Sequence, residues 1–293
     1  VLDFTYNANT LSHAPALVAL TMVTGRSGFE RDGSYSSPLE GHWQSFDAGI
    51  AAQTFCLAAH ALGLGTVIMG IYNCADTLVE SLESLEAQTY KKFKVILCDD
   101  GSKDNTLEVA QKWAETHPGY KVIRNEKNMG LNATLNRCLE YADTEFVARM
   151  DGDDRSLPHR FEQEVNFLDE HPQFAIVSGP MIYFDENGVF MKGRGHGEVT
   201  KRSFIAGSPF CHAPCLVRRE AYEAVGGYSE DKKLLRVEDY HLWFKMYAAG
   251  YKGYMLKEPI YEMRDDRNAT VRRNWLTRRN EAYVRYIGYK MLG

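Results

Sequence analysis

The stretch Glu145-Phe-Val-Ala-Arg-Met-Asp-Gly-Asp-Asp154 joins a short apolar run to a cluster of acids. The apolar run predicts a buried strand, and the acids predict a loop at its carboxyl end. Because residues two apart on an extended chain point the same way, Asp151 and Asp153 are expected to face one site. Two converging carboxylates repel each other unless a cation lies between them, and their oxygens suit Mg²⁺ or Mn²⁺. The alternative interpretation is a solvated acidic turn.

A second strand with the same kind of ending lies upstream. The apolar run Phe93–Cys98 is followed at once by Asp99 and Asp100. Around it, apolar runs such as 66–71 alternate with amphipathic helical patterns such as 77–88, which predicts an α/β fold with parallel strands and crossover helices. Ligands of such sheets bind where the strands end, so both acidic clusters are candidate site residues.

The pattern changes in the second half of the chain. The glycine-rich stretch 193–210 is predicted to be a loop with some mobility. An amphipathic helix is predicted over 238–249, and its first turn carries Glu238 and Asp239. A helix N-terminus favours acids through its dipole, so this pair has a structural explanation beside a catalytic one. A basic, tyrosine-rich helix is predicted over 274–291.

Composition excludes several classes of protein. The 293 residues carry 34 Lys and Arg against 39 Asp and Glu, a formal net charge of −5, and no basic run that would indicate a nucleic-acid binder. A hydrophobic content of 44% argues against global disorder. The apolar stretch 48–70 is broken by polar residues and glycines, so no membrane span is expected. Six cysteines in a chain too long to need disulfides, and a start without a secretory pattern, predict a cytoplasmic protein.

Six ordered motifs make the sequence resemble a family 2 glycosyltransferase of the GT-A fold over about residues 66–262. They are TVIMGIYN (66–73), QTY (88–90), VILCDDGS with DNT (95–106), NMGL (128–131), ARMDGDD with LP (148–158) and VEDY with LW (237–243). The resemblance implies a nucleotide-diphospho-sugar donor and transfer with inversion at the anomeric carbon. One departure is Gly70, which stands where the family usually has proline and leaves the following loop less constrained.

The resemblance also implies roles for residues of the donor side. Tyr72, together with Asp99 or Asp100, would hold the nucleoside. Asp151 and Asp153 would hold the ribose and the diphosphate, the latter through Mn²⁺ or Mg²⁺. A divalent cation there would neutralise the departing diphosphate.

On the acceptor side, one carboxylate of the Glu238-Asp239 pair would take the proton from the acceptor hydroxyl. Asp239 is the first choice for this base, and Glu238 is the alternative. The acceptor is expected to be a sugar, either lipid-linked or part of a glycan, which adds the inner face of the membrane as a second expected location. His212 matches a family position only in part, so it either lines the acceptor side or packs in the core.

Residues 13–70 resemble something else, the middle of a flavin-dependent nitroreductase. The resemblance rests on HAPALV (13–18), WQSFDAGIAAQ (43–53) and LAAHALGLGTVIMG (57–70), and it overlaps the glycosyltransferase pattern at 66–70. The chain is therefore interpreted as a chimera, and the Arg-rich beginning that contacts FMN is missing. Two other functions stay open: an FMN-dependent nitroreductase-like oxidoreductase, and an inactive chimera.

Three parts are expected on these grounds: a nitroreductase-like fragment (1–65), a GT-A domain (66–262) and a C-terminal helical extension (263–293). The predicted helix 46–62 is apolar around much of its circumference and cannot stay exposed in water. A homodimer formed through this helix is one way to cover it.

Overall fold

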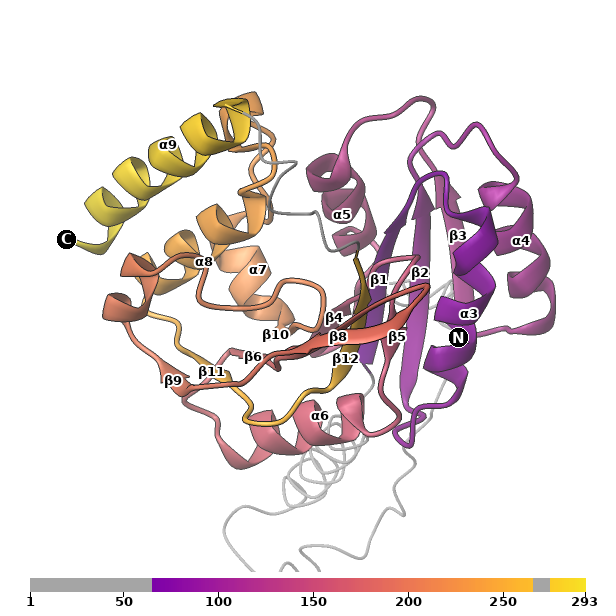
Figure 1. Cartoon of the computed structure of the whole chain (residues 1–293), viewed down its shortest axis with the longest axis horizontal. Coiled ribbons are helices and arrows are strands. Elements are labelled where there is room, and N and C mark those ends of the chain that lie inside the picture. Colours follow the sequence, from indigo (N-terminus) through magenta and orange to yellow (C-terminus); the bar gives the residue numbers. More distant parts are fainter. Residues whose placement is uncertain (1–64, 266–274) are drawn as a thin grey trace, which may run out of the picture. The chain divides into compact units, whose positions relative to one another are not determined.

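A computed structural model describes residues 65–265 and 275–293 (Figure 1). All of them belong to one compact unit that runs from Gly63 to Gly293. The predicted nitroreductase-like fragment, its helix 46–62 and the dimer through that helix lie outside the described residues.

The first half of this unit alternates strands and helices, as the sequence predicts. Its elements are β1 (Gly65–Ile71), α3 (Ala75–Glu86), β2 (Phe93–Asp99), α4 (Thr106–Thr116), β3 (Tyr120–Arg124), α5 (Leu131–Leu139) and β4 (Phe146–Arg149). The strands β3, β2, β1 and β4 are adjacent and parallel, so their carboxyl ends share one edge of the sheet.

The second half is more irregular. Its elements are β5 (Arg155–Ser156), α6 (Arg160–Glu170), β6 (Ile176–Ser178), β7 (Met181–Asp185), β8 (Gly188–Lys192), β9 (Gly197–Val199), η2 (Lys201–Ile205), β10 (Leu216–Arg218), α7 (Arg219–Val225), η3 (Lys232–Leu234), α8 (Glu238–Ala248), β11 (Gly253–Met255), β12 (Tyr261–Arg264) and α9 (Trp275–Leu292).

Two sheets result from these strands. The larger sheet has the order β3-β2-β1-β4-β10-β6-β11-β9, and the smaller has the order β5-β12-β7-β8. In the larger sheet β10 is antiparallel to β4 and to β6, and β11 is parallel to β6. Strands β6 and β11 therefore run in the same direction as β4, and all three end at the same edge.

The core divides according to the two-residue period of the strands. Ile68 and Ile96 pack with the residues of α5, α7 and α8 on one face of the sheet. Their neighbours Val67 and Val95 pack with α3, α4 and α6 on the other. Both faces are buried, which explains why these strands are apolar runs rather than alternating ones.

One prediction about the second half needs correction. The stretch 193–210 is not a loop throughout, because it contains β9 and the 3₁₀-helix η2. Strand β9 forms because its backbone pairs with β11, a contact distant in sequence that local periodicity cannot reveal. The predicted boundary at about residue 262 falls within β12, which ends at Arg264.

Candidate active site

A pocket of about 390 Å³ opens at the carboxyl ends of β1 and β4. Three segments line it: the β1–α3 loop, the loop after β4, and the end of β12. The lining residues are Gly70, Tyr72, Asn73, Cys74, Asp76, Thr77, Asp151, Gly152, Asp153 and Arg264. Tyr72, Asp151 and Asp153, predicted from the sequence to act together, therefore line one cavity.

Close packing holds the loop after β4 against the β1–α3 loop and the first turns of α3. A Cβ on Gly152 would lie 2.9 Å from Cys74 Sγ and 3.1 Å from Ile71 Cγ2, so a larger residue would have to push these side chains aside. Thr77 Oγ1 donates to the Gly152 carbonyl at 3.1 Å, and Ser81 Oγ donates to the Asp154 carbonyl at 2.6 Å. Helix α3 thus fixes the position of the Asp151–Asp154 loop.

The carboxylates of this loop are crowded. Loss of hydration and the nearby charge of Asp151 raise the pKa of Asp153. The same two causes, with the charge of Asp153 added, raise the pKa of the buried Asp154 to about 8. Such mutual repulsion fits a pair of carboxylates that share a cation. No three His, Cys, Asp or Glu side chains within 65–265 and 275–293 form a metal site by themselves, so ligand or water oxygens would have to complete the shell.

Arg149, the last residue of β4, lies at the electrostatic centre of the site. Its side chain is 4% exposed and forms an ion pair with Asp151. Burial raises the pKa values of Asp153, Glu238 and Asp239, and the positive charge of Arg149 opposes this rise, although the three acids belong to segments far apart in the sequence. The arginine therefore joins the pocket to the acidic start of α8.

Glu238 and Asp239 occupy the first turn of α8, as predicted. Asp239 Oδ2 accepts a hydrogen bond from Ser208 Oγ at 3.0 Å, and burial raises the pKa of Asp239. Burial, followed by the charge of Asp239, raises the pKa of Glu238 to about 7. Glu238 Oε2 is buried and has no hydrogen-bond partner in the part of the chain that the structure describes. Both carboxylates are thus more basic than usual, which suits proton abstraction near neutral pH.

Asp99 and Asp100 lie beside the pocket but do not line it. Both are almost fully buried. Asp100 accepts hydrogen bonds from Asn125 Nδ2 (2.8 Å), Met129 N (2.7 Å) and Gly130 N (2.9 Å), so its oxygens hold the loop before α5. Asp99 accepts from Ser102 N at 3.2 Å and pairs with Arg124 Nε at 3.4 Å.

Two residues of the site carried no role in the sequence analysis. Arg149 was quoted within a motif, and the signal that could have singled it out is a charge inside an apolar strand. Arg264 lines the pocket, its Nε donates to the Asp153 carbonyl at 3.1 Å, and its backbone N–H donates to Asp154 Oδ1 at 2.8 Å. No local signal marks Arg264, because the pairing of β12 with β5 and β7 brings it here.

His212 packs against the core. Its Nε2 lies 2.8 Å from the Tyr228 hydroxyl, and burial, with the charge of Arg149, holds its pKa well below the ordinary value. The imidazole ring contacts the rings of Tyr228 and Trp243, and a role on the acceptor side stays a prediction.

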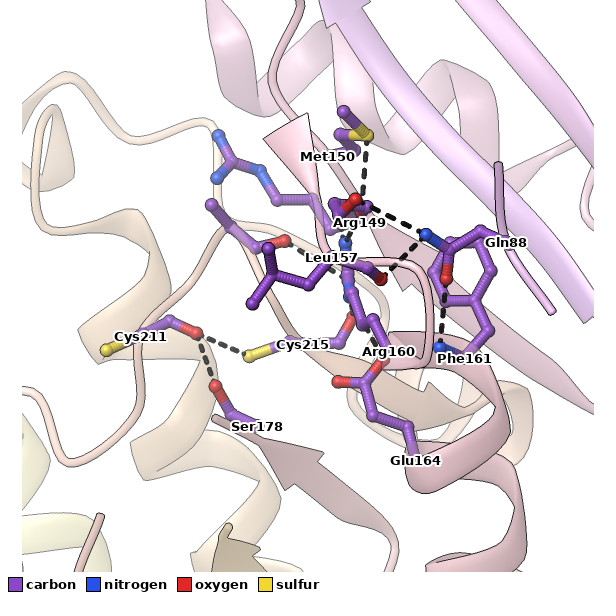
Figure 2. A network of polar contacts seen from close by, with 12 residues as sticks. Gln88, Arg149, Met150, Leu157, Arg160, Phe161, Glu164, Ser178, Cys211 and Cys215 are labelled. Atoms are coloured by element: carbon purple, nitrogen blue, oxygen red, sulfur yellow. Dashed lines mark hydrogen bonds and ion pairs between the residues drawn. The ribbon is translucent and has the colours of Figure 1, made fainter. Parts of the chain in front are cut away.

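A buried ion pair lies next to the end of β4 (Figure 2). Arg160 Nε donates to Glu164 Oε2 at 3.0 Å, and both side chains are fully buried. Arg160 Nη2 donates to the Arg149 carbonyl at 2.8 Å, and Nη1 donates to Ser156 Oγ at 2.9 Å. Arg160 therefore anchors the end of β4 through the Arg149 carbonyl.

Replacing Arg160 with alanine is expected to destabilise the protein strongly. Glu164 would be left buried and uncompensated, a situation that costs about 3–5 kcal/mol of unfolding free energy. The double variant R160M/E164L removes both charges and is expected to lose far less. Thermal denaturation of the two variants measures the difference, and an equal loss in both would show that the unpaired charge is not the cause.

The strand order, the parallel strands that end in acidic loops and the covering helices are those of the GT-A glycosyltransferase fold. The chain belongs to glycosyl transferase family 2, whose family model matches residues 66–226. The protein is thus an enzyme of the glycosyltransferase class.

Curated relatives agree with this assignment. EpsE of Bacillus subtilis (strain 168), whose name places it among the glycosyltransferases, is 41% identical over 78% of this chain and 82% of its own length. The amylovoran biosynthesis glycosyltransferase AmsE of Erwinia amylovora is 30% identical over 72% of this chain and 80% of its own. A UDP-Gal:alpha-D-GlcNAc-diphosphoundecaprenol beta-1,3-galactosyltransferase of Escherichia coli is 30% identical over 71% of this chain and 76% of its own.

Solved structures share the fold. TarS 1-349 of S. aureus in complex with UDP-GlcNAc superimposes with a TM-score of 0.64 at 22% identity, covering 78% of this chain and 66% of that one. The mannosyltransferase PcManGT of Pyrobaculum calidifontis, in complex with GDP-Man and Mn2+, has a TM-score of 0.55 at 21% identity, covering 78% and 71%.

The N-terminal resemblance is also confirmed. The Nitroreductase family model matches residues 4–98, so the two families overlap on this chain across 66–98. Within the described residues no helix is both long and apolar enough to cross a membrane.

Proposed function

We propose that this chain transfers a sugar from a nucleotide-diphospho-sugar to an acceptor hydroxyl, with inversion and with the help of a divalent cation. The observation that carries the proposal is the arrangement around Arg149. The buried Arg149 pairs with Asp151 at the pocket, and we infer that a donor held there would present its anomeric carbon towards a base in the first turn of α8.

For the donor, we assign the nucleoside to Tyr72 and to Asp99 or Asp100. Tyr72 is 41% exposed at the pocket, which leaves its ring free to stack. Both acids stay candidates, because protein donors contact both oxygens of Asp99 as well as both oxygens of Asp100. Asp151 is assigned to the ribose and to the metal, and Asp153 to the metal.

Mn²⁺ or Mg²⁺ held by Asp151 and Asp153 would supply positive charge for the departing diphosphate. Arg264 lies at the same pocket and would add a second positive charge. Arg149 orients Asp151 through their ion pair. These residues act on the leaving group only, so they do not require a covalent intermediate with the enzyme.

In the transfer itself, Asp239 would accept the proton of the acceptor hydroxyl. As the new bond from that oxygen to the anomeric carbon forms, the bond to the diphosphate oxygen breaks, and the nucleoside diphosphate leaves with the electron pair. Ser208 fixes one oxygen of Asp239 by a hydrogen bond, so the other can face the acceptor. Glu238 is the alternative base, because its buried Oε2 lacks a partner among the described residues.

For the acceptor, we propose a sugar that is lipid-linked or part of a glycan. The E. coli relative named above acts, by its name, on a diphosphoundecaprenol-linked sugar. A lipid-linked acceptor would bring this chain to the inner face of a membrane. Sedimentation of the protein with vesicles that contain such an acceptor measures this binding.

The donor pocket is expected to bind nucleotide sugars only with a divalent cation. A thermal-shift panel of UDP- and GDP-sugars is expected to raise the melting temperature in Mn²⁺ and not in EDTA, because a ligand that binds only the folded state stabilises it. We propose a domain boundary close to Gly63, so a chain that begins at Leu64 should give the same shifts. Absence of any shift, or purification of the full chain with bound FMN, would contradict the proposal and favour the inactive chimera or the flavin enzyme.

A further inference from the structure

A second groove, distinct from the donor pocket, lies at the far half of the sheet. Residues 192–197 and 257–258 line a hollow of about 600 Å³. The first segment connects β8 to β9, and the second follows β11. Neither segment has a role in the transfer described above.

The groove is basic. Its lining includes Lys192, Arg194, His196 and Lys257 against one acid, Glu258. All four basic side chains are exposed, and none forms an ion pair or a side-chain hydrogen bond with any residue in the described ranges. Three such cations gathered around one cavity, Lys192, Arg194 and Lys257, favour an anionic ligand.

The basic residues of the first segment occupy every second position. Basic residues at 192, 194 and 196 alternate with glycines at 193, 195 and 197, and the basic residues are exposed while the glycines are half-buried. The three basic residues line the same hollow.

The glycines let this segment dock on the second one. Gly195 N donates to the Lys257 carbonyl at 3.2 Å, and a Cβ on Gly195 would lie 1.6 Å from the Leu256 carbonyl oxygen. No other residue fits at 195 without moving the backbone of 256–257. The close approach brings Lys257 next to Lys192, Arg194 and His196, so backbone packing fixes the arrangement of the groove.

The groove opens at the same edge of the sheet as the donor pocket. Strand β11 runs in the direction of β4 and ends at Met255, just before Lys257, as β4 ends just before Asp151. Three strand-to-strand steps separate β4 from β11. At ~4.8 Å per step this is about 14 Å, the scale of a sugar and its linkage.

We propose that this groove binds a phosphate or diphosphate group that the acceptor carries next to the sugar whose hydroxyl is glycosylated. The inference rests on the proposed function and adds to it the chemical class of the acceptor. Arg194 would bind phosphate oxygens in a bidentate manner, and Lys192 and Lys257 would bind as point charges. The donor diphosphate is not the ligand, because its own site lies three strands away.

The test is a calorimetric titration of the full chain in EDTA, which disables the donor site and leaves the groove intact. The probes are inorganic pyrophosphate, dodecyl diphosphate and the uncharged dodecyl glucoside. The variant R194A/K257A is expected to bind both diphosphates about 100-fold more weakly, since each charged hydrogen bond lost costs about tenfold. The control K112A/K252A removes two exposed lysines outside the groove and should bind within about twofold of the wild type.

Donor binding in Mn²⁺ is measured on the same proteins. Unchanged donor binding in R194A/K257A separates failure of the groove from failure of the donor site. Equal affinity for the two diphosphates would indicate that the phosphate group alone is recognised, and tighter binding of dodecyl diphosphate would indicate a lipid-linked acceptor. Undiminished diphosphate binding in R194A/K257A, or equal binding of dodecyl glucoside, would overturn the proposal.

Discussion

Asp153→Ala is expected to abolish sugar transfer and the cation-dependent binding of the donor. Without this carboxylate the cation loses one of its two protein ligands, and the diphosphate would face Asp151 without a positioned positive charge. Loss of such electrostatic stabilisation costs about 10²–10³-fold in kcat. Steady-state transfer in Mn²⁺ and the donor-induced thermal shift measure the two effects.

The stability of this variant distinguishes a functional role from a structural one. The pKa of Asp153 is raised in the folded protein, so its ionised form opposes folding above the ordinary carboxyl pKa. Alanine removes that cost, and without ligand the variant should be at least as stable as the wild type at neutral pH. Asp169→Ala, an exposed carboxylate on α6, is the matched control and should transfer normally. Unchanged turnover of a folded Asp153→Ala in Mn²⁺ would reject this metal site.

Asp239→Asn is expected to leave donor binding intact and to lower transfer by about 10²–10⁴-fold, the usual contribution of a general base. The amide keeps the shape of the side chain and can still pair with Ser208, but it cannot accept the acceptor proton. In the wild type, activity should fall as the pH drops through the raised pKa of Asp239, because only the ionised carboxylate acts as a base.

Glu238→Gln is the matched variant, one residue away with the same change of carboxylate to amide. Glu238→Gln should retain most of the activity, and its activity should still fall at low pH. In Asp239→Asn this fall of activity at low pH should disappear. If Glu238→Gln removes the activity and Asp239→Asn does not, the base is Glu238.

Much of the site could be predicted from the sequence because its residues lie at the ends of strands, and each of these strands can be recognised from its own hydrophobic pattern. The apolar run before Asp151 and Asp153 is buried on both faces of the sheet, and the loop that follows must lie at the carboxyl edge. Tyr72 follows β1 in the same way. Adjacent parallel strands share that edge, so these three residues meet in one pocket.

The contributions of Arg149 and Arg264 could not be predicted, because each depends on a contact between distant segments. Arg264 reaches the pocket through the pairing of β12 with β5 and β7 in the smaller sheet. The strand β9, missed within 193–210, likewise depends on its pairing with β11. Strands of only a few residues show too little hydrophobic periodicity to be predicted from the sequence.

The sequence by itself determined the α/β class, the parallel half of the sheet and the acidic clusters that follow its strands, because hydrophobic periodicity and the direction of each strand are local properties. Only the tertiary structure decided which charges share a site. From the sequence, the basic residues at 192, 194 and 196 belong to an irregular segment. In the structure, Gly195 packs on the backbone of 256–257, and this contact brings the basic residues together with Lys257. Electrostatic interactions act through space over a few ångströms, so a charged group acquires its partners only when the chain has folded.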